Sequence, residues 1–136
     1  MKRTVVATAS LLVGGAALAD NLQGADRLVC APAQITICVE DAECYHAHAS
    51  ELGLPDFVII DLKSKKMLTT KASEQNRTTA FSTVTRAGGS IYLQGIDSGR
   101  AFSFVINEAT GSLTVAVSRD GATVTAFGAC TNAKVE

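Results

Sequence analysis

The segment Cys44-Tyr45-His46-Ala47-His48 contains both histidines of the chain and has residue types that bind metal ions. Side chains two positions apart in a strand point to the same face, so a strand here would place both imidazoles side by side. Imidazole nitrogen is a ligand for zinc and copper. One hypothesis is therefore a metal-handling protein that uses His46 and His48. The alternative is a polar surface loop, because short motifs of this kind often match by chance.

The chain shows no pattern of residues that is typical of an enzyme. It has no Gly-x-Ser-x-Gly elbow and no His-Glu-x-x-His motif. It also lacks the glycine-rich loops that bind phosphates or dinucleotides. The sequence therefore predicts no catalytic residue and no cofactor.

A second group of candidates consists of polar residues within otherwise apolar segments. Inside a barrel, such residues line cavities for small ligands. The alternative is that they form ion pairs at strand ends or face solvent, because charged groups are rarely buried without a partner. With two tyrosines and no tryptophan, the composition does not favour an aromatic platform for sugars. The candidate ligand-binding residues are Asp61, Arg77, Arg86, Gln94 and Arg100.

Residues 1–19 have the three parts of a signal peptide. Two basic residues are followed by an apolar stretch, and Ala17-Leu18-Ala19 places small residues at the −3 and −1 positions of a cleavage site. The apolar stretch is shorter than the roughly 20 residues that span a bilayer. We therefore expect cleavage before Asp20, no membrane span, and a single domain over residues 20–136 in the periplasm or outside the cell.

All four cysteines lie in the predicted mature domain. An even number of cysteines in an exported domain predicts two disulfides. Three pairings are possible, and we favour Cys38–Cys44 as a local loop and Cys30–Cys130 as a long-range link. A zinc site is the less favoured alternative, because the spacing of Cys38 and Cys44 is longer than in common zinc knuckles.

Charge limits the partners of the domain. Cleavage would remove Lys2 and Arg3 from the twelve basic residues, which leaves ten against thirteen acidic residues and a net charge of −3. Proteins bind phosphate backbones through clusters of Lys and Arg. The only such group is Lys63, Lys65 and Lys66, which we interpret as an exposed hairpin tip. We expect no nucleic-acid partner and a monomeric domain.

Short segments of alternating apolar and polar residues predict strands through most of the domain. The clearest are 100–107 and 112–118, and turn signals such as Ala87-Gly88-Gly89 and Asp120-Gly121 separate neighbouring segments. Residues 40–52 are richer in helix formers and are expected to hold one short helix or an ordered loop. The other expected strands are 34–39, 57–62, 65–70, 78–86, 90–95 and 122–130.

This pattern predicts an all-β fold, an antiparallel meander of about eight strands that forms a closed or half-open barrel. In a barrel the first and last strands are neighbours. Cys30 and Cys130 lie on those two strands, so the favoured disulfide and the barrel support each other.

Five parts of the chain combine distinctive residues: Leu54-Pro55-Asp56-Phe57 with Asp61-Leu62, Asn76-Arg77-Thr78-Thr79, Leu93-Gln94-Gly95, Gly99-Arg100-Ala101-Phe102-Ser103 and Phe127-Gly128-Ala129-Cys130-Thr131. Together they resemble a family of small exported proteobacterial proteins of unknown function. The resemblance covers most of the predicted mature chain. It implies a secreted β domain that ends in a cysteine, and it implies no activity.

A weaker likeness is to periplasmic C-type lysozyme inhibitors, which are also small, disulfide-bearing antiparallel barrels with a cysteine near the C-terminus. Their characteristic Ser-Gly-x-x-Tyr loop is absent, and the nearest segment is Gly88-Gly89-Ser90-Ile91-Tyr92. The leading hypothesis is an exported, non-enzymatic binding domain that presents a barrel cavity or a loop surface to a small molecule or a protein. The alternatives are an inhibitor of a lysozyme-like hydrolase and the metal-handling protein.

Overall fold

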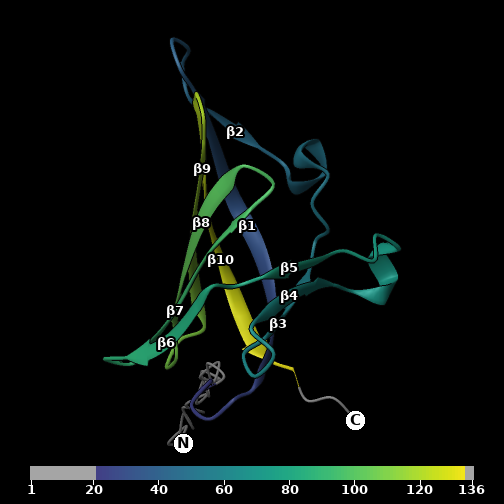
Figure 1. Ribbon diagram of the computed structural model, residues 1–136, viewed down its shortest axis with the longest axis vertical. Helices are drawn as coiled ribbons and strands as arrows, with labels where there is room; N and C mark the ends of the chain where they lie inside the picture. The colour runs from purple at the N-terminus through teal and green to yellow at the C-terminus, as the bar shows by residue number, and fades with distance from the viewer. Residues whose placement is uncertain (1–20, 134–136) are drawn as a thin grey trace, which may run out of the picture.

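The computed structural model describes residues 21–133, which form ten strands and two single turns of 3-10 helix (Figure 1). The predicted signal peptide and its cleavage site lie outside these residues. The all-β prediction is confirmed. The strands are β1 (Arg27–Val39), β2 (Tyr45–Ala47), β3 (Val58–Asp61), β4 (Lys66–Thr69), β5 (Thr78–Ala80), β6 (Thr83–Ala87), β7 (Ser90–Asp97), β8 (Arg100–Asn107), β9 (Ser112–Arg119) and β10 (Ala122–Asn132). The 3-10 turns are η1 (Ala49–Leu52) and η2 (Lys71–Ser73).

Two features account for the difference between ten strands and the eight expected. The segment 40–52, expected to hold one short helix or an ordered loop, contains the short strand β2 and the single 3-10 turn η1. The segment 78–86, expected as one strand, is divided into β5 and β6.

The strands form one antiparallel sheet that curls into a half-barrel (Figure 1). The order across the sheet is β5-β4-β3-β1-β10-β9-β8-β7-β6, and β2 pairs with part of β1. Strand β1 therefore lies beside β10, and the predicted neighbourhood of the first and last strands is confirmed. The two ends of the sheet are β5 and β6, which are consecutive in the chain.

The link between β5 and β6 transfers the chain from one end of the sheet to the other. The main-chain N–H of Phe81 donates to the carbonyl oxygen of Lys65, beside β4, at 2.8 Å. The next N–H, of Ser82, donates to the carbonyl oxygen of Gln94 on β7, also at 2.8 Å. The segment expected as one strand thus pairs first with β4 and then with β7, which draws the two ends of the sheet together at this link.

A bulge bends the long pair β1 and β10. Their register shifts between Pro32 and Gln34, so that Ala33 is an extra residue. Pro32 has no N–H for the ladder, and such a residue within a sheet is found at bulges. Gly128 is its partner on β10, and a β-carbon there would overlap the carbonyl oxygen of Ala31. The missing side chain of Gly128 therefore lets the two strands approach closely at the bend.

The concave side of the half-barrel is filled by apolar side chains. Three phenylalanine rings pack there edge to face or tilted, with ring centroids 5.6 to 5.9 Å apart: Phe81, Phe102 and Phe104. A smaller cluster beneath η1 contains Ile35, Ile37, Ala47 and Ala126. The main cluster of buried residues is Leu22, Ala25, Leu28, Cys30, Ile60, Leu62, Phe81, Ile91, Leu93, Phe104, Ile106, Leu113 and Cys130.

The segment before β1 closes one end of this core. The side chain of Leu22 is fully buried, and its main-chain N–H donates to the carbonyl oxygen of Glu108 at 2.7 Å. The guanidinium of Arg86 binds the same region, with Nη1 2.6 Å from Oε1 of Glu108 and Nη2 donating to the carbonyl oxygen of Ala25. Arg86, expected as a possible ligand residue, is thus engaged by the chain itself.

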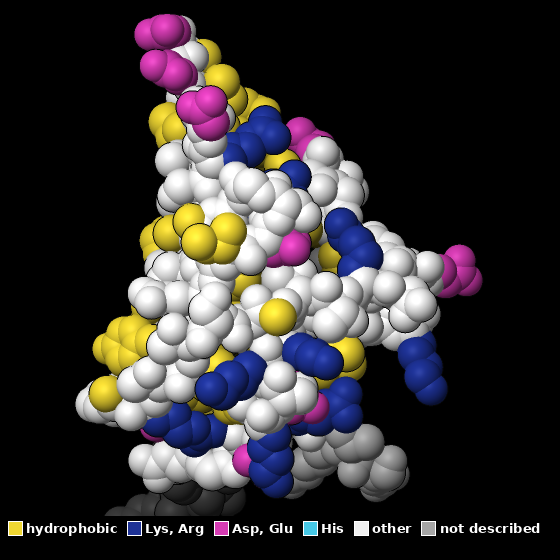
Figure 2. Space-filling view, in the orientation of Figure 1, with side chains coloured by type: hydrophobic (Ala, Val, Ile, Leu, Met, Phe, Trp, Pro, Cys, Tyr) yellow, Lys and Arg dark blue, Asp and Glu magenta, His cyan; other side chains and the backbone are white. Residues whose placement is uncertain are grey.

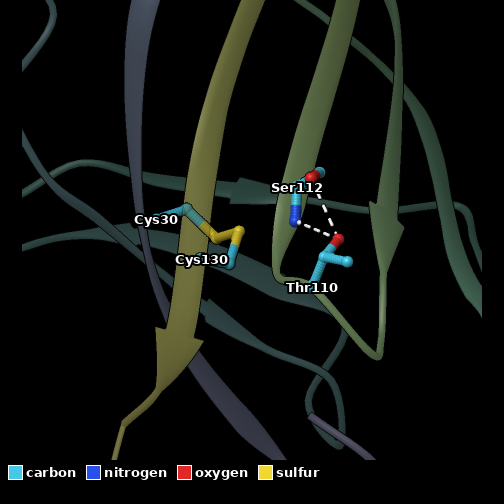
Figure 3. The surroundings of a disulfide bond; sticks show 4 residues. All are labelled: Cys30, Thr110, Ser112 and Cys130. Atoms are coloured by element: carbon cyan, nitrogen blue, oxygen red, sulfur yellow. Dashed lines mark hydrogen bonds between the residues drawn. A yellow bond between two sulfur atoms is a disulfide. The ribbon is translucent and has the colours of Figure 1, made fainter. Parts of the chain in front are cut away.

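Both predicted disulfides are confirmed. Cys30 and Cys130 are directly opposite each other in the register of β1 and β10, and Cys38–Cys44 closes the connection between β1 and β2. Figure 3 shows the first disulfide beside the turn between β8 and β9. In that turn, the hydroxyl of Thr110 accepts the N–H of Ser112 at 3.2 Å and donates to its hydroxyl at 2.9 Å.

Candidate binding surface

The two histidines lie on and next to β2, and both are exposed. His46 is opposite Thr36 on β1, with 3.3 Å between Nδ1 and the threonine Oγ1. The main-chain N–H of His48 donates to Oε1 of Glu51 at 2.9 Å. Within residues 21–133, no three His, Cys, Asp or Glu side chains are grouped so that they could hold a metal ion. The metal hypothesis stays a prediction that rests on these two side chains.

Asp61 and Arg77 bind neighbouring backbone rather than a shared cavity. At the end of β3, Oδ1 of Asp61 accepts the N–H of Ser64 at 2.9 Å, and Nε of Arg27 lies 4.0 Å from Oδ2. The hydrogen bond from Ser64, supported by the charge of Arg27, holds the pKa of Asp61 below its ordinary value. Before β5, Nη2 of Arg77 donates to the carbonyl oxygen of Gly53 at 2.7 Å.

Gln94 and Arg100 lie on a different part of the sheet. Gln94 is exposed on β7. Its sequence neighbours Leu93 and Gly95 point to the other face of the sheet and are buried. Arg100 is exposed at the start of β8 and pairs in register with Asp97. The structure thus places the predicted ligand residues in separate environments, and a binding role for each stays a prediction.

Two shallow hollows open on the surface near the ends of the half-barrel. The larger, of about 540 Å³, lies between the turn after β3 and strand β6 and is lined by Gly24, Asp26, Leu62, Lys63, Val84 and Arg86. Its charges are paired: Nζ of Lys63 is 2.8 Å from Oδ2 of Asp26, and this hydrogen bond raises the pKa of Lys63. The smaller, of about 440 Å³, lies beside the Cys38–Cys44 loop. The larger hollow borders the main apolar cluster through Leu62, and the smaller one is lined by no buried member of either cluster.

The convex side of strands β6 to β10 is a broad surface without charged side chains. In these strands the outward positions alternate with positions that are buried or half-buried, except for Arg86, Asp97, Arg100 and Arg119, which are exposed at or near strand ends. The pairing brings outward positions of neighbouring strands side by side. None of them is Asp, Glu, Lys, Arg or His. We call this surface the uncharged face. Its residues are Thr83, Thr85, Ala87, Ser90, Tyr92, Gln94, Ile96, Ala101, Ser103, Val105, Asn107, Ser112, Thr114, Ala116, Ser118, Thr123, Thr125, Phe127, Ala129 and Thr131.

Two aromatic side chains lie on one row of the uncharged face. Tyr92 on β7 is opposite Val105, which is opposite Thr114, which is opposite Phe127 on β10. Tyr92 is 42% exposed and Phe127 is 59% exposed. Three strand spacings of about 4.8 Å separate them, so their backbones are roughly 14 Å apart. The row continues to Gln34 on β1, which is opposite Phe127.

Charged side chains gather elsewhere. Three acidic residues, Glu40, Asp41 and Glu43, lie in the disulfide-closed connection from β1 to β2. The N–H of Glu40 donates to the carbonyl oxygen of Gly121, which ties this loop to the β9–β10 turn. Figure 2 shows the resulting group of acidic side chains at the narrow tip of the molecule, with most visible Lys and Arg side chains toward the other end.

Comparisons with protein-family models, curated proteins and solved structures find no match to this chain. Among the described residues, no helix has the length and apolar character needed to cross a membrane. The resemblances stated from the sequence stay predictions.

Proposed function

We propose that this chain is an exported, non-enzymatic binding domain that holds its partner on the uncharged face. The observation that carries the proposal is the complete lack of charged side chains at the outward positions of five adjacent strands. An exposed protein surface ordinarily has a substantial share of Lys, Arg, Glu and Asp. The buried centres of binding interfaces are instead depleted of charge and enriched in aromatic residues. The uncharged face shares the lack of charge with such interfaces, and it exposes two aromatic side chains, Tyr92 and Phe127.

The interior of the half-barrel supports a surface site rather than a cavity. The predicted cavity for a small molecule would occupy space that the apolar side chains of the core fill. The two hollows described above are shallow, and the charges of the larger one are satisfied within the chain. The two disulfides support export, because such bonds persist in oxidising compartments.

The test compares two matched substitutions. Thr114→Glu places a charge in the middle of the uncharged face, and Thr78→Glu places the same charge on β5, away from it. Each variant of the mature domain is labelled and sedimented with the insoluble envelope fraction of bacterial cells. We expect the envelope fraction to retain amounts of the unmodified domain and of Thr78→Glu that agree within twofold. We expect it to retain at least tenfold less of Thr114→Glu. No retention of the unmodified domain, or equal retention of both variants, would contradict the proposal.

The two alternatives from the sequence have direct tests of their own. Adding the purified domain to lysozyme tests the inhibitor alternative, and an unchanged rate of hydrolysis removes it for that enzyme. Titrating copper or zinc into the domain and into the His46→Ala/His48→Ala variant tests metal handling. Equal metal binding by both proteins would show that these histidines are not the metal ligands.

A further inference from the structure

The uncharged face offers hydrogen bonds but no charge. Between Tyr92 and Phe127 the outward side chains are small hydroxyl, methyl and amide groups, such as Ser103, Thr114 and Asn107. Hydroxyl and amide side chains both donate and accept hydrogen bonds. A ligand that matches this surface must therefore carry many donors and acceptors and no net charge.

Each of the two rings has an amide side chain close to it. Gln34 is opposite Phe127 in the register of β1 and β10. Gln94 is on the same face of β7 as Tyr92, two positions further along the strand. An aromatic ring presents a flat apolar surface, and the amide beside it supplies both a donor and an acceptor. A sugar ring has the complementary construction, with C–H groups on its faces and hydroxyl groups around its rim.

The side chains that lie between the two rings distinguish among classes of partner. Protein interfaces are enriched in Tyr, Trp, Phe, Met and Arg and depleted of Ser and Ala. The centre of the uncharged face has the reverse bias, with Ser, Thr and Ala at most outward positions of β8 and β9. Nucleic acids and anionic polymers bind through Lys and Arg, and this face has neither.

We infer that the uncharged face binds a neutral glycan chain, which crosses strands β7 to β10 with sugar rings on Tyr92 and Phe127. The inference rests on the proposed function and names the chemical class of its partner. Because the two rings are roughly 14 Å apart along the row, an oligosaccharide contacts both of them and a monosaccharide contacts one. The domain therefore binds neutral oligosaccharides more tightly than the corresponding monosaccharides.

The experiment uses the mature domain and calorimetric titration with soluble tetrasaccharides. The neutral probes are the tetramers of N-acetylglucosamine, of β-1,4-linked glucose and of α-1,4-linked glucose. The N-acetylglucosamine and glucose monomers test the effect of length, and tetragalacturonate tests the effect of negative charge. We expect at least one neutral tetramer to bind at least tenfold more tightly than its monomer and than tetragalacturonate.

Matched aromatic substitutions test whether the tetrasaccharide binds on the uncharged face. Phe127→Ala and Tyr92→Ala remove the two rings, while Phe57→Ala and Tyr45→Ala remove rings of similar exposure that lie outside this face, at 53% and 49%. We expect a loss of affinity of at least tenfold for the first two and a change within twofold for the controls. Because all four side chains are exposed, thermal unfolding should confirm that every variant is folded.

Three outcomes would overturn the inference: no binding of any neutral tetramer, tighter binding of tetragalacturonate, or equal losses in the face and control variants. If Thr114→Glu prevents retention by the envelope while no neutral tetramer binds, the inference fails and the proposed function stands. If the envelope retains the unmodified domain and Thr114→Glu equally, the proposed function fails together with the inference.

Discussion

The main-chain N–H of Cys130 donates to the carbonyl oxygen of Gly111 at 2.7 Å, and a β-carbon on Gly111 would overlap the carbonyl oxygen of Cys130. The turn between β8 and β9 thus lies against β10 at the residue that carries the long-range disulfide (Figure 3). Gly111 also has a φ of 72°, which L side chains rarely adopt. Two independent constraints therefore require glycine at this position.

Substitution of Gly111 by alanine should destabilise the domain through both constraints. A non-glycine residue at this φ costs about 1–3 kcal/mol, and the displacement of β10 adds a cost of about 1–3 kcal/mol of overpacking. Gly99→Ala is the matched control, because Gly99 has a φ of 73° but open space around it. Urea unfolding should show a loss near 3 kcal/mol or more for Gly111→Ala and near 1 kcal/mol for Gly99→Ala. Equal losses would show that the close contact with Cys130 is unimportant.

The two disulfides should differ in their effect on stability. They join residues 100 and 6 positions apart, and the loop-entropy relation gives about 5 kcal/mol for the first loop and about 2 kcal/mol for the second. We therefore expect Cys30→Ala/Cys130→Ala to lower the free energy of unfolding more than Cys38→Ala/Cys44→Ala does. Denaturant unfolding under non-reducing conditions measures both. A larger loss of unfolding free energy for Cys38→Ala/Cys44→Ala would mean that native contacts of the loop closed by this disulfide matter more than chain entropy.

Local patterns in the sequence were sufficient to predict much of the fold. The alternation over 100–107 and 112–118 is the pattern of strands with one buried face, and β8 and β9 occupy these segments. The long-range disulfide Cys30–Cys130 was predictable because the first and last strands of a curled meander are neighbours. The division of 78–86 was not, because the transfer at Phe81 and Ser82 depends on hydrogen bonds to Lys65 and Gln94, which are distant in the chain.

The uncharged face was not visible in the sequence for the same reason. The separate strands show outward Ser, Thr and Ala residues, but only the register places Tyr92 and Phe127 on one row. The amino-acid composition includes few aromatic residues and does not indicate that two of them share a surface. The polar residues predicted around a cavity share their chemical type but no common site, and the structure places Asp61 and Arg77 against nearby backbone.

The segment before β1 should contribute to stability although it has no regular secondary structure. Leu22 is fully buried at the end of the core, so Leu22→Ala removes apolar contacts and leaves a cavity. Such substitutions destabilise by about 2–5 kcal/mol. Leu54→Ala is the control, since Leu54 is exposed, and its loss should be below about 1 kcal/mol. Thermal and urea unfolding of the two variants measure the difference, and similar losses would show that the segment is dispensable.

The lowered pKa of Asp61 predicts a pH dependence with a definite sign. The hydrogen bond from Ser64 and the charge of Arg27 favour the ionised carboxylate in the folded state. A carboxyl group whose pKa is lower in the folded than in the unfolded state stabilises the fold above its unfolded pKa, and this contribution is lost as the pH falls through the folded pKa. Asp61→Asn should therefore be less stable than the unmodified domain at pH 7, and the difference should shrink below about pH 4. Urea unfolding between pH 7 and pH 2.5 measures this change, while an NMR titration of the Asp61 carboxyl group should inflect below the ordinary value of 3.8. An inflection at or above that value, or a stability difference that grows in acid, would show that Ser64 and Arg27 do not stabilise the carboxylate.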